Sequence, residues 1–249
     1  MKLILTSGHR VGSRWLHYLL SQLTGQAIHP ELGTKWFSTP QKRNKVASLI
    51  RQGKLVKFHG VYPSRIYKNF GGQNFKVLVV VRNPRDRAVS YAFHNRYHDR
   101  TTFRQKTLGS DQEAVEYTVY RDNLFRSEAK QQIKIMVPEL STRSYSGKDS
   151  DYIWTCYEWL KEDIYSEIKT ILNSAHLDIS DNSIKRAIAD NSFKAKAGRS
   201  EGQESRKDLW RRKGIVGDWK NWYTEKMIED TQEEFDNYFK VLSLCSKDE

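Results

Sequence analysis

The chain has 249 residues, of which 38% are hydrophobic and 29% charged, a composition typical of one globular domain over residues 1–249 rather than of a disordered protein. No apolar run approaches the roughly 20 residues that span a bilayer, and the N-terminal segment lacks the apolar core of a signal peptide. We therefore expect a cytoplasmic protein without stable membrane insertion. The two cysteines, Cys156 and Cys245, do not have the spacing of a metal site, and Cys156 is interpreted as inert packing.

Positive charge is concentrated at the start of the chain. The formal net charge is +12, and the segment from Met1 to Arg85 contains fifteen Lys or Arg residues against a single acidic residue, Glu31. A field of one sign over a third of a chain favours an anionic partner, either a nucleic acid or a polyanionic small molecule. A solvated basic face would give the same count, so charge alone does not choose among these readings.

The first third of the sequence predicts short strands and an early helix. Leu3–Leu5 is a buried strand, and Ser7–Arg14 is a turn that contains glycine. The following helix ends at Gly25 and has its apolar residues on one face, at Leu16, Leu19, Leu20 and Leu23. Further strands are predicted at Val56–His59 and Val77–Val81, and the second of these does not alternate, which indicates a strand covered on both faces.

The later elements are predicted with one large gap. Asn83 caps a helix that begins at Pro84 and continues to about Arg96. Residues 97–150 are polar and without a clear pattern, and we interpret them as a variable acceptor-site or lid region. A strand at Tyr152–Tyr157 follows. The remaining elements are helices near Ile164–Leu172 and Ile184–Ala189, an irregular basic segment at Gly198–Gly217, and a last helix capped by Thr224.

Strands that alternate with helices predict an α/β fold, a three-layer sandwich in which helices flank a central parallel β-sheet. In such folds ligands bind at the carboxyl ends of the strands. The turn after the first strand would then be a P-loop-like phosphate site. Its sequence, S-G-H-R-V-G-S-R-W from Ser7 to Trp15, offers backbone N–H groups at a helix N-terminus. No Lys-Ser/Thr pair follows the second glycine, so this is not a Walker motif, and such turns are also often purely structural.

Two further segments have groups suited to phosphate. In V-R-N-P-R-D-R-A-V-S-Y, Arg82 follows a buried strand, where its charge needs water, an anion or an acidic neighbour, and Ser90 could donate to the same anion. In R-R-K-G-I-V-G-D-W-K-N-W, from Arg211 to Trp222, cations and a glycine lie on an irregular segment, and arginine is suited to bidentate phosphate contacts.

Together these segments resemble the cytosolic-type sulfotransferases that use 3′-phosphoadenosine 5′-phosphosulfate (PAPS). That family's first signature reads approximately P-K-S-G-T-T-W-L, against H-R-V-G-S-R-W-L from His9 to Leu16. Its second has an arginine after an apolar strand and a serine eight positions later, as in Arg82 and Ser90. Its third, R-K-G-x-x-G-D-W-K-N-x-F-T, matches Arg212–Thr224 with a tyrosine in place of the phenylalanine.

The resemblance implies a PAPS-dependent O-sulfotransferase, without a metal ion, whose product is adenosine 3′,5′-bisphosphate (PAP). It implies that the phosphosulfate is bound by Arg10, Gly12, Ser13 and Arg14. The 3′-phosphate would be bound by Arg82, Ser90, Arg212, Lys213 and Gly214. The adenine would lie against Trp15, Tyr157 and Phe193, with Ser192 beside them. Tyr157 and Phe193 belong to Y-E-W-L-K-E-D and N-S-F, which are similar to the family's Y-E-D-M-K-E-D and T-S-F; core packing is the other interpretation of both rings.

The same resemblance implies a catalytic set of His59, Lys57, Arg10 and Ser90. V-K-F-H-G, from Val56 to Gly60, is similar to the family's K-T-H, so His59 would accept the proton of the acceptor hydroxyl. His9, His17 and His94 are the competing histidines. Fixed cations, Lys57 and Arg10, would neutralise the charge that develops on the leaving oxygens.

The chain departs from the family at the first signature. Arg10 replaces the family's lysine. The guanidinium spreads its charge over a planar group, so its position relative to a bridging oxygen differs from that of a lysine ammonium. Arg14 replaces a threonine and adds a cation. The acceptor, a small molecule, lipid or carbohydrate with a hydroxyl group, is not identified by the sequence, which also leaves homodimer formation open.

Three alternatives are kept. A P-loop kinase would need the missing Lys-Ser/Thr pair and a magnesium-binding Asp after a strand. A nucleic-acid-binding protein would explain the basic first third, but the sequence has no known binding motif of that kind, and we expect no nucleic-acid partner. A catalytically inactive relative that still binds the nucleotide is the third.

Overall fold

The structure is a computed structural model, which describes residues 2–28, 32, 34–60, 63–70, 74–98, 104–123, 125–127, 129–130 and 152–245. The chain divides into two compact units. The first comprises Met1–Val81 and Arg143–Ser192, and the second comprises Arg82–Thr142 and Phe193–Glu249. Most of the predicted acceptor-site region, residues 97–150, lies outside the described residues or in short pieces, so its role stays a prediction. The single domain over residues 1–249 also stays a prediction.

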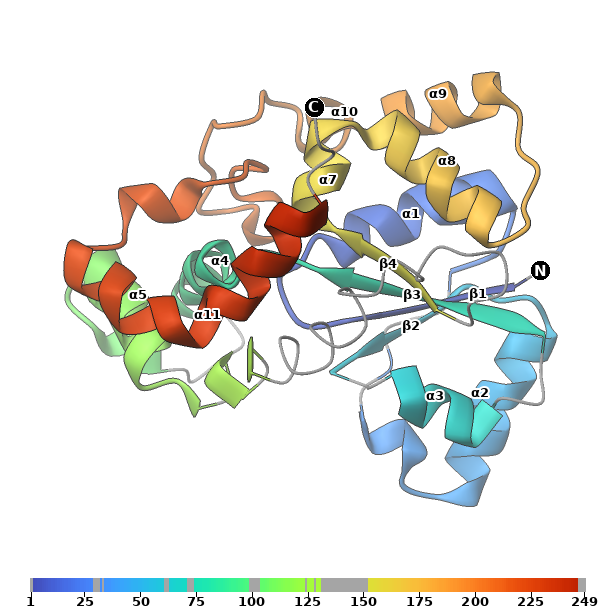
Figure 1. Ribbon diagram of the computed structural model, residues 1–249, viewed down its shortest axis with the longest axis horizontal. Helices are drawn as coiled ribbons and strands as arrows, with labels where there is room; N and C mark the ends of the chain where they lie inside the picture. Colours follow the sequence, from blue (N-terminus) through green and yellow to red (C-terminus); the bar gives the residue numbers. More distant parts are fainter. Residues whose placement is uncertain are drawn as a thin grey trace. The chain divides into compact units, whose positions relative to one another are not determined.

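The first unit contains a parallel sheet with the strand order β2-β1-β3-β4 (Figure 1). The strands are β1 (Lys2–Ser7), β2 (Val56–His59), β3 (Phe75–Val81) and β4 (Tyr152–Cys156). All three pairings are parallel, and the register places Ser7 of β1 opposite His59 of β2 and Val80 of β3. The predicted parallel sheet is confirmed. All four strands therefore end at one edge of the sheet, where their polar residues gather.

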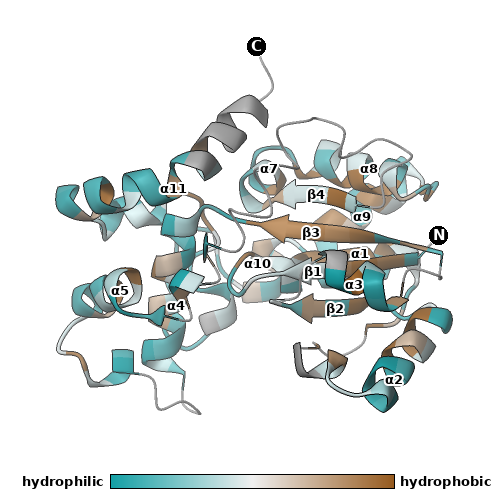
Figure 2. Cartoon of the chain, turned by 60° about the horizontal axis from the view of Figure 1, so that its bottom comes forward, coloured by the Kyte–Doolittle hydropathy of each residue, from teal (hydrophilic) through white to brown (hydrophobic). Residues whose placement is uncertain are grey.

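Helices cover both faces of this sheet and form the three predicted layers (Figures 1 and 2). One face is covered by α1 (Ser13–Thr24), α8 (Ile164–Ser174) and α9 (Asp181–Asp190), whose apolar residues share one core cluster with Leu5 of β1 and Val80 of β3. The helices on the other face are α2 (Pro40–Arg51) and α3 (Pro63–Phe70).

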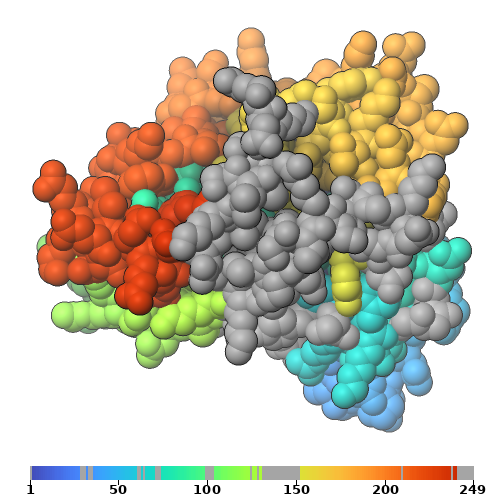
Figure 3. All heavy atoms as spheres, viewed as in Figure 1, coloured from blue at the N-terminus to red at the C-terminus, as the bar shows by residue number. Residues whose placement is uncertain are grey.

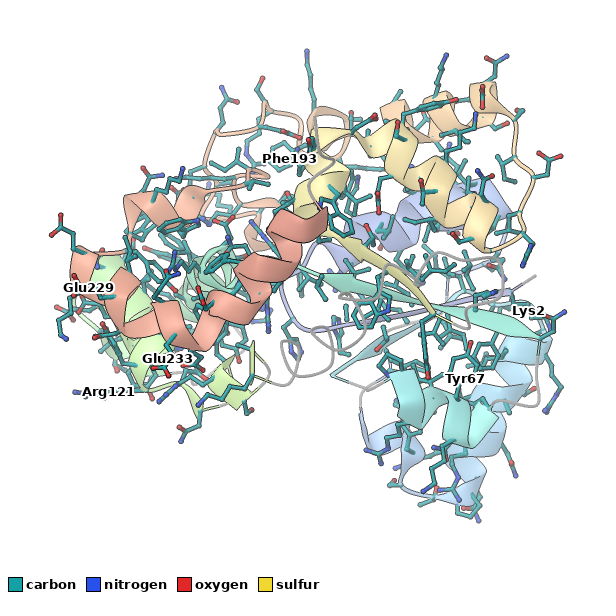
Figure 4. The ribbon with its side chains drawn as sticks, in the orientation of Figure 1. Lys2, Tyr67, Arg121, Phe193, Glu229 and Glu233 are labelled. Carbon is teal, nitrogen blue, oxygen red and sulfur yellow. The ribbon has the colours of Figure 1, made fainter. Side chains whose placement is uncertain are left out.

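The strands are apolar because both of their faces are buried. Every residue of β3 is buried, and Figure 2 shows this strand as the most continuously hydrophobic one. On the α3 side, Phe58 of β2 stacks against Phe70 with ring centroids 6.4 Å apart. Tyr67, labelled in Figure 4, extends from α3 and donates its hydroxyl hydrogen to the carbonyl oxygen of Phe75, 3.2 Å away. The lack of alternation in the Val77–Val81 sequence thus has the predicted cause.

The second unit is built from helices and turns. Its long helices are α4 (Pro84–Tyr97), α5 (Asp111–Tyr120) and α11 (Glu225–Cys245). Helices α5 and α11 lie side by side at the surface (Figures 1 and 3), where the Tyr120 hydroxyl donates to Asp230 Oδ2 over 2.8 Å. Its short elements are η2 (Arg104–Thr107), α10 (Phe193–Ala197), η4 (Leu209–Arg211) and η5 (Asp218–Asn221).

Helix caps explain most of the element boundaries. Asn83 Oδ1 accepts a hydrogen bond from the Arg85 amide at 2.9 Å, and the Thr224 hydroxyl oxygen accepts one from the Met227 amide at 3.2 Å, as the sequence predicts for both caps. One predicted boundary is wrong by a residue. Tyr157 does not end β4 but begins α7 (Tyr157–Glu162), because Cys156 Sγ accepts from the Trp159 amide and caps that helix.

Cys156 is buried, and burial raises the pKa of its thiol well above the ordinary value, which agrees with inert packing. Among the residues that the structure describes, no helix has the length and apolar character to cross a membrane.

The core of the first unit can be tested on α1. Leu20 is fully buried in the cluster between α1 and the sheet, whereas the Tyr18 side chain on the same helix is 48% exposed. Leu20→Ala should lower the free energy of unfolding by about 2–5 kcal/mol, because it removes buried methyl groups and leaves a cavity. Tyr18→Ala should change it by less than about 1 kcal/mol. Urea denaturation followed by circular dichroism measures both, and equal losses would contradict this packing.

Candidate functional site

The turn between β1 and α1 leads into a helix start that no side chain among the described residues caps. Gly12 is the residue before α1 and has a left-handed backbone, with φ at 80°. Ser7 and Ser13 are buried, and the Ser7 hydroxyl donates to Ser13 Oγ at 2.9 Å. The first turn of α1 contains no acidic residue. An uncapped helix N-terminus with nearby hydroxyls is suited to phosphate.

Arg10 lies in this turn with a backbone conformation that is uncommon for a residue with a side chain. Its φ is +64°, one of two such values at non-glycine residues in the described part of the chain. The left-handed region costs an L-residue free energy, of order 1 kcal/mol. Arg10, which replaces the family's lysine, therefore has a backbone conformation that is locally disfavoured.

An aromatic wall lies directly against the same turn. A Cβ atom added to Gly12 would lie 2.5 Å from Cδ2 of Tyr157, so only glycine fits between the turn and this ring. Trp15 meets Tyr157 edge-on, with ring centroids 6.3 Å apart, and its Nε1–H donates to the carbonyl oxygen of Asn191 at 2.7 Å. The first unit thus brings together Gly12, Trp15 and Tyr157, which the sequence assigns to one nucleotide.

The carboxyl end of β2 supplies the predicted base. His59 pairs in register with Ser7 at the end of β1, and Lys57 pairs with Leu5, so that Lys57 and His59 project from the sheet face that α1 covers. The Lys57 side chain is buried. The ring of His59 is stacked on that of His9 from the turn, with centroids 4.8 Å apart and an angle of 8° between the planes. The stack holds the imidazole of His59 beside the β1–α1 turn.

The second unit gathers the cations of the third signature around a carboxylate. Asp218, 3% exposed, forms an ion pair with Arg212, and Lys213 Nζ lies 2.7 Å from its Oδ1. Burial alone would raise the pKa of Asp218, but the charge of Arg212 and hydrogen bonds from Lys213, Arg212 and Asn221 lower it below the ordinary value. The Arg212 guanidinium also lies over the ring of Phe93, 4.3 Å from its centroid. Both cations are therefore held in fixed positions.

Helix α4 fixes the segment that follows these cations. Asp86, 1% exposed, accepts hydrogen bonds from the amides of Gly217 at 2.7 Å and Trp219 at 3.0 Å. Phe93, which contacts Arg212, lies two turns further along the helix. Ser90 is buried between these positions in sequence, at spacings of four and three residues, and so lies on the same helical face. Ser90 therefore lies on the face of α4 that holds Asp86 and Phe93, and its role in binding the 3′-phosphate stays a prediction.

Arg82 and Phe193 approach the same segment from other parts of the second unit. Arg82 Nη2 donates to the carbonyl oxygen of Ile215 at 3.0 Å. A Cβ atom added to Gly214 would lie 2.4 Å from Cδ2 of Phe193, which places that ring directly against the glycine. Arg199 lies over the Phe193 ring, 5.1 Å from its centroid, and Figure 4 labels Phe193 at the start of α10.

The predicted site residues therefore form two groups, one in each unit. The first group is Arg10, Gly12, Ser13, Arg14, Trp15, Lys57, His59, Tyr157 and Ser192. The second group is Arg82, Ser90, Phe193, Arg212, Lys213 and Gly214. The gathering of both groups around one ligand stays a prediction.

Sequence reasoning missed the two acidic residues that hold the segment of the third signature, Asp218 through its cations and Asp86 through its backbone amides. Asp86 and Asp218 both lie in segments that are suited to phosphate binding, V-R-N-P-R-D-R and G-D-W-K-N, but the sequence assigns neither aspartate a role in the site. A buried aspartate needs donors, and the neighbouring cations in each motif were the available signal. His9 was named only as a competitor of His59, whereas its ring stacks on that residue.

Known proteins are similar to this chain over nearly its whole length. A family model described as a sulfotransferase domain matches residues 1–243. A gorilla protein, Sulfotransferase 6B1, is 26% identical over 257 residues, covering 98% of this chain and 78% of that protein.

Solved structures share the fold. Mouse sulfotransferase SULT7A1 complexed with PAP has a TM-score of 0.67 and 20% identity, covering 98% of this chain and 86% of that one. Retinol dehydratase in complex with androsterone and inactive cofactor PAP has a TM-score of 0.59 and 16% identity, covering 95% and 80%. The protein belongs to the sulfotransferase domain family, because the family model covers nearly the whole chain.

The role of Asp86 can be tested without a ligand. Asp86→Ala should leave the amides of Gly217 and Trp219 without their acceptor and lower the free energy of unfolding by about 2–4 kcal/mol. Hydrogen–deuterium exchange should accelerate in peptides that cover residues 214–220. Glu229→Ala, at an exposed position of α11, is the control and should change neither quantity. Unchanged exchange at residues 214–220 in Asp86→Ala would contradict the proposed anchoring.

Proposed function

We propose that this protein is a PAPS-dependent O-sulfotransferase, which transfers the sulfuryl group to a hydroxyl group of a small molecule, lipid or carbohydrate. One observation beyond family membership carries the proposal. Arg212 is 7% exposed, and its Nε atom is buried without a hydrogen-bond acceptor among the described residues, while its Nη1 atom makes no hydrogen bond there and lies 3.4 Å from Glu204 Oε1. Buried guanidinium donors without acceptors are costly, so an anionic ligand is the expected partner.

The second unit would bind the 3′-phosphate of the nucleotide. Arg212 and Lys213 are adjacent cations held by Asp218, and Arg82 reaches the same segment through the Ile215 carbonyl. An arginine held in one orientation has lost its rotamer entropy before the phosphate arrives, which favours binding. Ser90 would add a hydroxyl donor, and Gly214 leaves room for Phe193 to line the adenine.

The first unit would bind the phosphosulfate and the other side of the adenine. The uncapped start of α1, with Ser13, offers backbone amides to the 5′-phosphate, and Arg14 adds a positive charge. Trp15 and Tyr157 already form an edge-on pair against the turn. PAP-bound relatives with this fold, such as mouse SULT7A1, support the choice of nucleotide.

The chemistry would be an in-line displacement at sulfur. His59 would accept the proton of the acceptor hydroxyl while its oxygen forms a bond to sulfur. The bond between sulfur and the bridging oxygen would break, and the electron pair would leave with the 5′-phosphate of PAP. Lys57 and Arg10 would stabilise the negative charge on that leaving oxygen. The stack with His9 would keep the imidazole of His59 oriented for this transfer.

Two coarser features of the proposal rest on the family. We infer that both units act as one sulfotransferase domain, because the family model runs through residues 1–243 without a break. The family implies a hydroxyl-bearing acceptor. The cytoplasmic location and the homodimer stay predictions.

Nucleotide preference separates this function from that of a kinase. PAP at about 100 times its dissociation constant should stabilise the folded protein by about 2.7 kcal/mol, which corresponds to a rise in Tm of about 5–10 °C for a chain of this size. The rise should occur without magnesium. ATP should raise Tm much less, with or without magnesium, and differential scanning fluorimetry compares the two. Equal stabilisation by ATP with magnesium would favour the kinase.

Binding and chemistry should separate in two variants. His59→Ala should retain PAP affinity within about twofold and lose at least about a hundredfold in sulfuryl transfer, because only proton acceptance is removed. Arg212→Ala should instead weaken PAP binding by tenfold or more, since a charge-assisted contact contributes about 1.5–3 kcal/mol.

Calorimetry with PAP and a radioactive sulfate-donor assay over a panel of hydroxyl compounds give both readouts. Full transfer by His59→Ala would exclude His59 as the base. PAP binding by the wild-type protein without transfer to any acceptor would favour the catalytically inactive relative.

A further inference from the structure

A glutamate shares the two cations that the proposed function assigns to the 3′-phosphate. Glu204 Oε1 lies 3.4 Å from Arg212 Nη1, and Glu204 Oε2 lies 3.7 Å from Lys213 Nζ. All three residues belong to the second unit. Nη1 is one of the two Arg212 nitrogens that have no hydrogen-bond acceptor among the described residues. The carboxylate is therefore near the side of the guanidinium that makes no hydrogen bond, and it forms an ion pair with it.

The backbone holds Glu204 in this place. The amide of Ser205 donates to the carbonyl oxygen of Arg212 at 3.0 Å, and the amide of Gly202 donates to that of Lys213 at 2.9 Å. These two hydrogen bonds lie on either side of Glu204 in the sequence. The segment that carries the glutamate is thus paired with the segment that carries the cations, and their proximity does not depend on side-chain rotamers alone.

The two carboxylates around these cations differ in character. Asp218 is 3% exposed and accepts hydrogen bonds from Lys213 and Asn221, so it is part of the scaffold. The Glu204 side chain is 28% exposed, and its contacts to both cations are longer. Ion pairs at 3.4 and 3.7 Å without a hydrogen bond are weaker than short, hydrogen-bonded ones such as that between Lys213 and Asp218. Glu204 can therefore give up its contacts to a stronger anion at low cost.

The charges at this cluster balance only when Glu204 is counted. Two cations face two carboxylates, whereas a cluster without Glu204 would have one net positive charge. A phosphate dianion that approaches Arg212 Nη1 and Lys213 Nζ must displace the Glu204 carboxylate or bind beside it. Either event opposes binding, through the lost ion pairs or through repulsion between like charges.

We infer that Glu204 is a specificity-determining residue that competes with the 3′-phosphate for Arg212 and Lys213 and so limits the affinity for donor and product. The inference rests on the proposed function, because it assigns the 3′-phosphate to these cations. Glu204 lies outside every segment that carries the family resemblance. Weaker retention of PAP would favour its release after transfer.

The experiment compares two isosteric variants and two nucleotides. Glu204→Gln removes the competing charge, and Glu201→Gln removes one charge from an exposed turn three residues earlier, so both variants have the same net charge. Adenosine 5′-monophosphate lacks the 3′-phosphate and serves as the control ligand. Isothermal titration calorimetry at 50 mM and 300 mM salt measures the dissociation constants, and circular dichroism verifies folding.

Glu204→Gln should bind PAP about threefold to tenfold more tightly than the wild-type protein at low salt, with a smaller gain at high salt. Its affinity for adenosine 5′-monophosphate should change by less than about twofold. Glu201→Gln should resemble the wild-type protein with both nucleotides.

Each contrary result has a distinct meaning. If the wild-type protein does not bind PAP, the proposed function and this inference both fail. If the wild-type protein binds PAP and Glu204→Gln binds it equally or more weakly, only the inference is overturned. An equal gain in Glu201→Gln, or an equal gain for adenosine 5′-monophosphate, would attribute the effect to general charge and would also overturn it. Should Glu204→Gln fail to fold, Glu204→Ala is measured in its place against the same expectations.

Discussion

A parallel sheet imposes the constraint on which this molecule depends: all of its strands end at the same edge. β1 ends at Ser7, β2 ends at His59, and β4 ends at Cys156 immediately before Tyr157. Arg82 directly follows β3 in the chain. Buried strands admit few polar side chains, and the assigned residues Ser7, His59 and Arg82 lie at or directly after strand ends, with Lys57 two residues before the end of β2. In the first unit, the residues assigned to the phosphosulfate and to proton transfer begin at these ends, which is where ligands bind in parallel sheets.

Buried carboxylates impose a second constraint, on the cations. Arginine and lysine side chains are long and lose substantial rotamer entropy when they bind an anion. Asp218 holds Arg212 and Lys213, and Asp86 fixes the backbone of the same segment through Gly217 and Trp219. The entropy is therefore lost during folding rather than during ligand binding. Asp218 also lowers the net positive charge around Arg212 and Lys213, so the carboxylate that positions these cations weakens their attraction for an anion. By the inference above, Glu204 weakens it further.

Strands, helix caps and the glycine-containing turn after β1 could be predicted from the sequence because they depend on local patterns. Val77–Val81 is apolar throughout, Asn83 and Thr224 are helix caps, and G-x-x-G-D-W is a dense motif. The contacts that hold the site could not be predicted. Asp86 reaches an amide 131 positions later in the chain, and His9 meets His59 only because β1 and β2 pair in one particular register. Neither contact has a local periodicity, so each depends on tertiary structure. Helices α2 and α3 were not predicted either, because their polar sequences bury only one narrow face.

The distribution of charge shows why motif position is more informative than net charge. The excess of cations before Arg85 includes Lys42, Lys45 and Arg51, which are exposed on α2, and Arg65, which is exposed on α3. These cations form a solvated basic face, which is one of the explanations of the net charge that composition alone left open. Arg10, Arg14 and Lys57 have a different setting: they lie in the turn after β1, at the start of α1 and in β2, respectively. Exposed cations are screened by salt within about 8–10 Å, whereas charges that are buried or partly buried are screened much less. The same net charge of +12 on a chain without these strand ends would attract polyanions generally and select none.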